Sequence, residues 1–159
     1  MYDYDILLVN TYSDKQQEID SIRLLKEVNS GCKNATDSFG QVMEFVRDEK
    51  LKNLIDEYNK KHVKIGDECH QMLNDYGKDE KDPPTVAKAM MWFTTEVKML
   101  MDDDDSHIAK LLADGCNMGM QSLNKYMNEF EKAGQEEVNL ASRLVDIESE
   151  LYDKLMPYM

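Results

Sequence analysis

Residues 31–43 read GCKNATDSFGQVM, and residues 115–127 repeat that pattern as GCNMGMQSLNKYM. The shared glycine, cysteine, serine and methionine positions are related by a constant offset of 84 residues. In both stretches apolar side chains recur at steps of three and four residues, which is the period of one face of a helix. The repeat therefore predicts two similar long helices, one in each half of the chain.

The helical period continues outward from both copies of the repeat. It predicts helices over residues 15–47, 51–76, 85–101, 106–130 and 140–155. The second of these should end at Gly77, a residue type that commonly follows the last helical turn. Pro83-Pro84 then predict a break before a shorter crossover helix at about 85–101.

Two turns are expected to close the helical pairs. Residues 47–50 read as a tight polar turn, and Gly134 marks the second one. The acidic run from Asp102 to Asp105 should favour the positive end of a helix dipole, with Asp105 or Ser106 as the cap. The helix after the second turn matches the helix after the first one at an offset near 86 residues, instead of 84. The two turns are therefore expected to differ in length by two residues.

These elements predict an all-α fold. Two helical hairpins joined by a proline-marked crossover should form a bundle with an approximate internal twofold axis. Residues 15–159 are expected to form this single domain, and residues 1–14 an N-terminal arm or an extension of the first helix. Both alternatives for residues 1–14 stay open, because Ile6 to Val9 fit a helix or an extended segment.

Charge and composition exclude several classes of function. The net charge of -13 is spread along the chain, which argues against binding to nucleic acid or to an anionic membrane surface. No apolar run approaches the ~18 residues of a membrane span, and no basic leader precedes the first apolar stretch. The three cysteines contain no closely spaced pair, so a reduced, cytoplasmic protein is expected.

The chain resembles the ferritin-like superfamily, and within it the small bacterial proteins of rubrerythrin type. The resemblance covers roughly residues 20–155. It rests on Asp48-Glu49-Lys50-Leu51-Lys52-Asn53-Leu54 at the first hairpin, on Gly115-Cys116, and on Trp92-Phe93 followed by Glu96-Val97-Lys98. It implies an up-down four-helix bundle made of two hairpins, with an extra helix in the crossover.

Diiron proteins of this superfamily use one Glu from each of two helices and a Glu-x-x-His from each of the other two. By resemblance, Cys32 and Cys116 stand at the first type of position, and His62 and Glu148 are the nearest candidates for the second. Neither following helix contains Glu-x-x-His. The resemblance therefore does not imply iron oxidation or iron storage for this chain.

The same four residues are expected to share one layer of the bundle. Each of the four residues is separated from the nearest hairpin turn by a similar number of residues. This number corresponds to roughly 20–24 Å along a helix. Two thiolates, an imidazole and a carboxylate would suit zinc or another transition metal. The alternative is packing alone, because cysteine often serves as a small buried apolar residue. The candidate site is Cys32, His62, Cys116 and Glu148.

No nucleophile–base pair, phosphate loop or dinucleotide fingerprint is present in the sequence. The leading hypothesis is therefore a non-enzymatic bundle without a diiron site or any expected cofactor, with a protein-interaction or stress-related role. The Met-rich crossover region predicts contact with a protein partner or self-association, for example as a dimer. The alternative hypothesis is a metal-binding or thiol-redox bundle that uses the Cys/His/Glu layer.

Overall fold

The computed structural model describes residues 2–78, 87–101 and 104–159, without the side chains of residues 2–4 and 87–89. These residues form helices and contain no strand. The prediction of an all-α protein is therefore confirmed. The helices are α1 (Tyr2–Met43), α2 (Glu49–Asp75), α3 (Ala87–Lys98), α4 (Asp105–Glu129) and α5 (Gln135–Leu155), followed by a short 3₁₀ helix, Met156–Tyr158.

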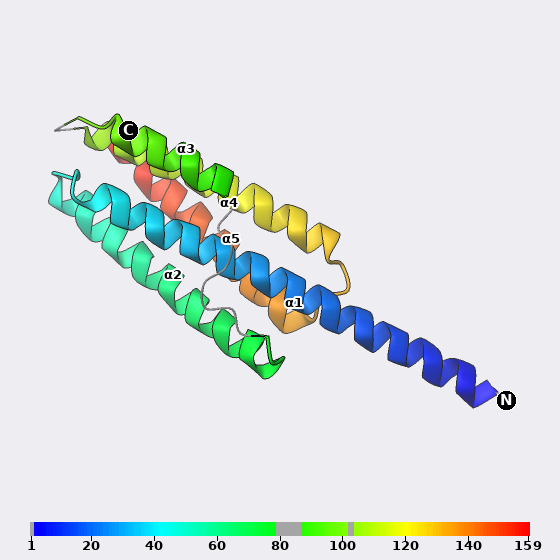
Figure 1. The fold of residues 1–159 in the computed structure, drawn as a ribbon. Helices are drawn as coiled ribbons and strands as arrows, with labels where there is room; N and C mark the ends of the chain where they lie inside the picture. The colour runs from blue at the N-terminus through cyan, green and yellow to red at the C-terminus, as the bar shows by residue number, and fades with distance from the viewer. Residues whose placement is uncertain (1, 79–86, 102–103) are drawn as a thin grey trace.

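The long helices pair as two antiparallel hairpins that pack together into a bundle (Figure 1). α1 pairs with α2 and α4 pairs with α5, while α1 also packs against α4 and α5. The shorter helix α3 lies against α1. Because α2 ends and α4 begins at opposite ends of the bundle, the chain returns along its length between them, and α3 belongs to that return (Figure 1).

The first turn is placed earlier than predicted. α1 ends at Met43 and α2 begins at Glu49, so Glu49 and Lys50 are helical rather than part of the turn. The reason is Asp48, whose carboxylate accepts a hydrogen bond from the Leu51 N–H at 3.0 Å and so starts α2.

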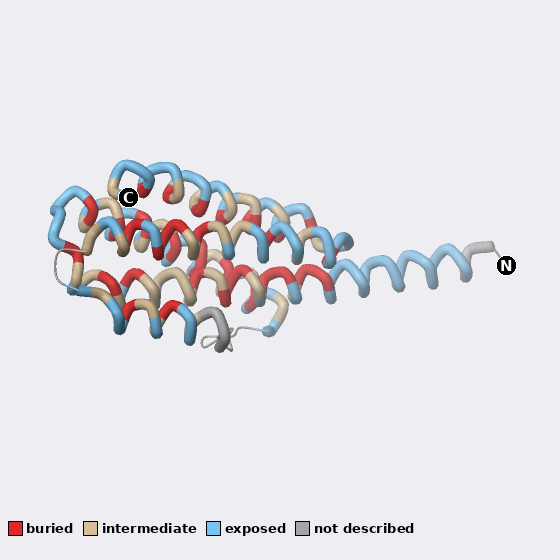
Figure 2. Tube along the Cα trace, turned by 90° about the horizontal axis from the view of Figure 1, so that it is seen from above, coloured by how far each residue is buried: buried red, intermediate tan, exposed pale blue. Residues whose placement is uncertain are grey.

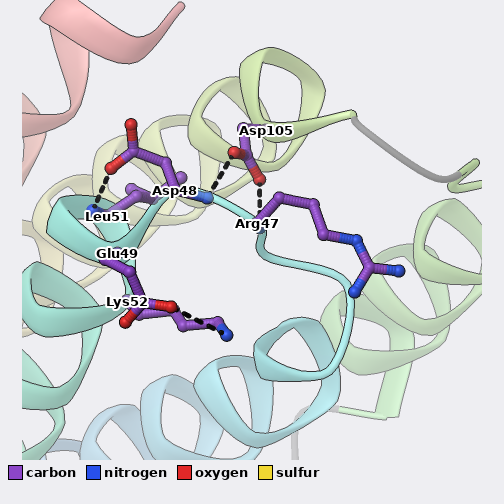
Figure 3. Close-up of polar contacts among 6 residues, drawn as sticks. All are labelled: Arg47, Asp48, Glu49, Leu51, Lys52 and Asp105. Atoms are coloured by element: carbon purple, nitrogen blue, oxygen red, sulfur yellow. Dashed lines mark hydrogen bonds and ion pairs between the residues drawn. The ribbon is translucent and has the colours of Figure 1, made fainter.

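The helix after the acidic run also begins differently from the prediction, because its N-cap is Asp104 rather than Asp105 or Ser106. The Asp105 carboxylate instead accepts hydrogen bonds from the backbone N–H groups of Arg47 and Asp48, at 2.9 and 2.8 Å (Figure 3). A residue of α4 thus holds the turn between α1 and α2.

The second turn is held in the corresponding way by α1. Asp20 accepts a hydrogen bond from the Lys132 N–H at 3.0 Å, and Ser21 accepts one from the Gly134 N–H at 2.8 Å. The offset from Asp20 to Asp105 equals the offset from Arg47 to Lys132. The two hairpins therefore fix each other's turns reciprocally, which supports the predicted internal twofold relation.

The end of α2 follows the prediction. Gly77 has a φ of 69°, a left-handed conformation in which a side chain would be strained. Its N–H bonds to the Asn74 carbonyl, and the Lys78 N–H bonds to the Leu73 carbonyl, which closes the last turn. The predicted break at Pro83-Pro84 lies outside the described residues. The crossover helix is shorter than predicted, since α3 ends at Lys98.

The core consists of two clusters of buried apolar side chains arranged along the bundle. One contains Cys116 and the other contains Cys32, so the predicted Cys/His/Glu layer lies where the clusters meet. The predicted helical seams supply most of both clusters. They include Leu25, Val28, Phe39, Val42, Val46, Leu51, Ile55, Ile65, Leu112, Leu123, Leu140, Leu144 and Leu151.

The N-terminal part of α1 projects beyond the other helices (Figures 1 and 2). Residues 5–19 are all exposed, and Asp20, the next residue, is buried. This segment is helical and continuous with the rest of α1. No described helix is both long enough and apolar enough to cross a membrane.

Candidate functional site

Four helices each bring one residue of the predicted layer to the centre of the bundle. Cys32 comes from α1, His62 from α2, Cys116 from α4 and Glu148 from α5. All four side chains are buried, with His62 fully removed from solvent and Glu148 only 7% exposed. A buried imidazole and a buried carboxylate are costly unless each finds a partner.

His62 and Glu148 are each other's partner. His62 Nε2 lies 2.6 Å from Glu148 Oε1, and His62 Nδ1 lies 2.6 Å from the Tyr58 carbonyl oxygen one helical turn earlier. The Phe39 ring packs edge-on against the imidazole, with ring centroids 5.2 Å apart. Both ring nitrogens of His62 are therefore engaged, and an apolar ring covers its side.

This geometry fixes the number of protons that the pair holds. A carbonyl oxygen only accepts hydrogen bonds, so His62 Nδ1 must carry a proton. The 2.6 Å contact between Nε2 and the carboxylate also needs a proton between its two atoms. The pair then holds two protons and has no net charge, whether the second proton resides on His62 or on Glu148.

The two cysteines of the layer are held as neutral thiols. Burial raises the pKa of the Cys32 thiol well above its usual value, with further contributions from Cys69 and Glu148. Burial also raises the pKa of the Cys116 thiol strongly, and the nearby Glu148 carboxylate adds to the effect by its charge and by accepting a hydrogen bond. Glu148 thus interacts with all three other residues of the layer.

Among the residues that the structure describes, no group of three or more His, Cys, Asp or Glu side chains is positioned to hold a metal ion. Cys32, Cys69 and Cys116 are not joined in a disulfide. The prediction of a metal layer stays a prediction, since the same four residues do lie around Glu148.

Small residues let the helices approach this layer. A Cβ atom at Gly119 would lie 3.6 Å from the Glu148 carboxyl carbon, and one at Gly66 would lie 3.6 Å from the Cys32 Cβ. Gly115, which the repeat had highlighted, has open space beside it. Gly66 was not predicted, although it lies on the same helix as His62.

A cleft of about 200 Å³ opens beside the layer, between α1, α3 and α4. Cys116 and Glu148 lie at its inner side. Asn34 also lines the cleft, and its side-chain oxygen is buried without a hydrogen bond from any described residue. Periodicity did not reveal this cleft, because it is made by small residues on facing helices.

The fold and the site together define an all-α helical bundle with a buried, mutually satisfied polar layer at its centre. Residues 20–129 match the family model described as "Domain of unknown function (DUF2383)", and the chain belongs to that family. The comparisons with curated proteins and with solved structures gave no match.

Proposed function

We propose that α1, α2, α4 and α5 form a ferritin-like four-helix bundle that works without a diiron centre, as a non-enzymatic binding protein. The observation that carries this proposal is the direct contact between His62 and Glu148 in the central layer. A diiron centre needs several carboxylates around an open space. Here the one carboxylate of the layer is already bonded to the imidazole.

The thiols of the layer support the same proposal. Cysteine binds metals and acts as a nucleophile in its thiolate form, and burial holds Cys32 and Cys116 as neutral thiols. The layer therefore contains no activated nucleophile and no free base. Within the layer His62 bonds to Glu148, and Cys116 is hydrogen-bonded to Glu148, which is the behaviour of a structural core.

Apolar side chains on the surface support a role in contact with other protein chains. The projecting part of α1 exposes Ile6, Leu7, Leu8 and Val9, each by at least 59%. Methionines near the crossover helix are exposed as well: Met91, Met99 and Met101. Methionine adapts to differently shaped apolar partners. The partner of this proposal is a second copy of the chain or a different protein, bound outside the central layer.

A soft-metal site is the second candidate function. The observation in its favour is that Glu148 interacts with His62, Cys32 and Cys116 at once. Zinc accepts sulfur, nitrogen and oxygen ligands in a tetrahedral arrangement. Binding would require both thiols to lose their protons and His62 to exchange Glu148 for the metal. A thiol-redox role would likewise require the buried thiols to become reactive.

Two measurements on the purified protein test the leading proposal. Oxygen consumption after addition of Fe²⁺ should not exceed that of buffer, because no diiron ligand set is present. Static light scattering should report an oligomer that dissociates when residues 1–14 are deleted and does not respond to iron. Iron oxidation at enzymatic rates would contradict the proposal. A full-length chain that is monomeric, like the deletion variant, and that binds no other protein would contradict it as well.

A further inference from the structure

The cleft beside the central layer exists because small side chains face each other across two helices. α1 contributes Ser30, Gly31 and Ala35, and α4 contributes Gly119 and Ser122. Because these side chains are short, they leave the space between α1 and α4 unfilled. The resulting volume of about 200 Å³ exceeds an engineered cavity of roughly 150 Å³ that accommodates benzene in another protein.

Aromatic side chains form much of the wall. Phe39 comes from α1, Tyr126 from α4, and Trp92 and Phe93 from α3, so three helices contribute. Aromatic rings favour an aromatic guest through offset or edge-on packing. Their negatively polarised faces also attract a cationic group placed over them. The wall thus suits a ring-sized ligand more than a long flexible chain.

The polar lining of the cleft includes a buried acceptor, the side-chain oxygen of Asn34. The Asn34 side-chain oxygen is shielded from solvent and has no donor among the described residues, although buried polar atoms nearly always have a partner. The Glu27 carboxylate also lines the cleft, in a chain of net charge -13. A ligand that donates a hydrogen bond and carries positive charge would satisfy the oxygen and match the surrounding charge.

We propose that this cleft is a binding site for a small aromatic amine. The ring lies among the aromatic side chains of α1, α3 and α4, and the ammonium group donates a hydrogen bond to the Asn34 oxygen. Binding needs no metal and leaves the contact between His62 and Glu148 intact. Ligand binding in the cleft therefore does not depend on whether the central layer holds a metal.

Trp92 provides the readout, because it lines the cleft and is the only tryptophan of the chain. The probes are 2-phenylethylamine, n-propylbenzene, which has the same size and no donor, and phenylacetate, which has the opposite charge. Titration of the full chain should change the Trp92 fluorescence saturably with the amine. We expect the amine to bind at least about tenfold more tightly than either other probe, a clear difference in binding free energy.

Two variants test the role of the cleft residues. Asn34→Leu should lower the affinity for 2-phenylethylamine to within about threefold of that for n-propylbenzene, because the acceptor is lost while the apolar volume is kept. The matched control Asn124→Leu, at an exposed position of α4 outside the cleft, should leave both affinities unchanged. Ala35→Met should weaken binding of every probe by filling the cleft, and circular dichroism verifies that each variant is folded.

Several outcomes would overturn the proposal. These are no saturable change with the amine, equal affinity for phenylacetate, or an Asn34→Leu variant that keeps the full preference for the amine. A Trp92 signal that varies with protein concentration in the absence of any probe would instead assign the cleft to a second copy of the chain. That result would also overturn the proposal.

Discussion

His62 and Glu148 occupy equivalent positions in the two hairpins, at an offset of 86 residues, and they touch each other at 2.6 Å in the centre of the bundle. Two identical residues at these positions would repel each other if both were charged. Two carboxylates, for example, would need a cation between them. With His on one side and Glu on the other, the two side chains bond to each other directly.

The first prediction concerns the loss of one member of this pair. Glu148→Leu leaves His62 Nε2 buried without a partner and should lower the free energy of unfolding by about 1–3 kcal/mol. Glu148→Gln should cost less than about 1 kcal/mol, because the amide N–H can donate to the unprotonated Nε2 while Nδ1–H still donates to Tyr58. Chemical denaturation at pH 7 measures both. Equal costs for the two variants would show that the hydrogen bond to His62 does not stabilise the bundle.

The second prediction concerns the turn between α1 and α2. Asp105→Ala removes the acceptor for the Arg47 and Asp48 N–H groups and should cost about 1–2 kcal/mol of stability. Asp114→Ala is the matched control on the same helix. Its carboxylate forms only an exposed pair with Lys110, so a change within about 0.5 kcal/mol is expected. Thermal unfolding monitored by circular dichroism compares them, and an equal effect would contradict the assigned role of Asp105.

The third prediction concerns the cysteines. Because burial raises the pKa of the Cys32 and Cys116 thiols, both should stay protonated at pH 8 and react slowly with a thiol reagent in the native state. After denaturation, three thiols per chain should react at once. A fast-reacting thiol in the native protein would contradict this, and fewer than three thiols after mild oxidation would indicate a disulfide.

The fourth prediction is a dependence of stability on pH. Arg143 donates hydrogen bonds to Glu68 and so lowers the pKa of this carboxyl in the folded state, linking α5 to α2. A lowered pKa stabilises the fold above the usual pKa of Glu, and this contribution disappears as the pH falls. Since both side chains are partly exposed, Glu68→Gln should cost less than about 1 kcal/mol at pH 7, and the cost should shrink as the pH falls through the lowered pKa of Glu68. A cost that does not decrease in acid would mean that the charge is not responsible.

Periodicity predicted the helices and the buried seam well, because residues such as Leu25, Val28 and Val42 owe their burial to local spacing along one helix. The repeat likewise predicted two hairpins, since the same pattern should fold in the same way twice. Gly77 was predictable because a left-handed residue at a helix end favours glycine.

Long-range contacts were not predictable in the same way. The acidic run suggested a helix start, but nothing local indicates that Asp105 would bond to a turn 57 residues earlier in the chain. The counts from the two turns suggested a shared layer, whereas the rotation of each helix decides that His62 faces Glu148 and not a thiol. The cleft beside Asn34 depends on the separation of α1 and α4. Small residues on these helices are compatible with several separations, so the sequence does not determine this one.

The most direct test of the central claim, that the His62–Glu148 pair replaces a metal in the layer, is metal analysis combined with thermal unfolding. The protein is purified without a histidine tag, and its melting temperature is measured with zinc and with a chelator. The account predicts far less than one metal ion per chain and a melting temperature that neither addition changes. The contradicting result is about one zinc per chain, with a melting temperature that zinc raises and the chelator lowers, and loss of both effects in the Cys32→Ser/Cys116→Ser double variant.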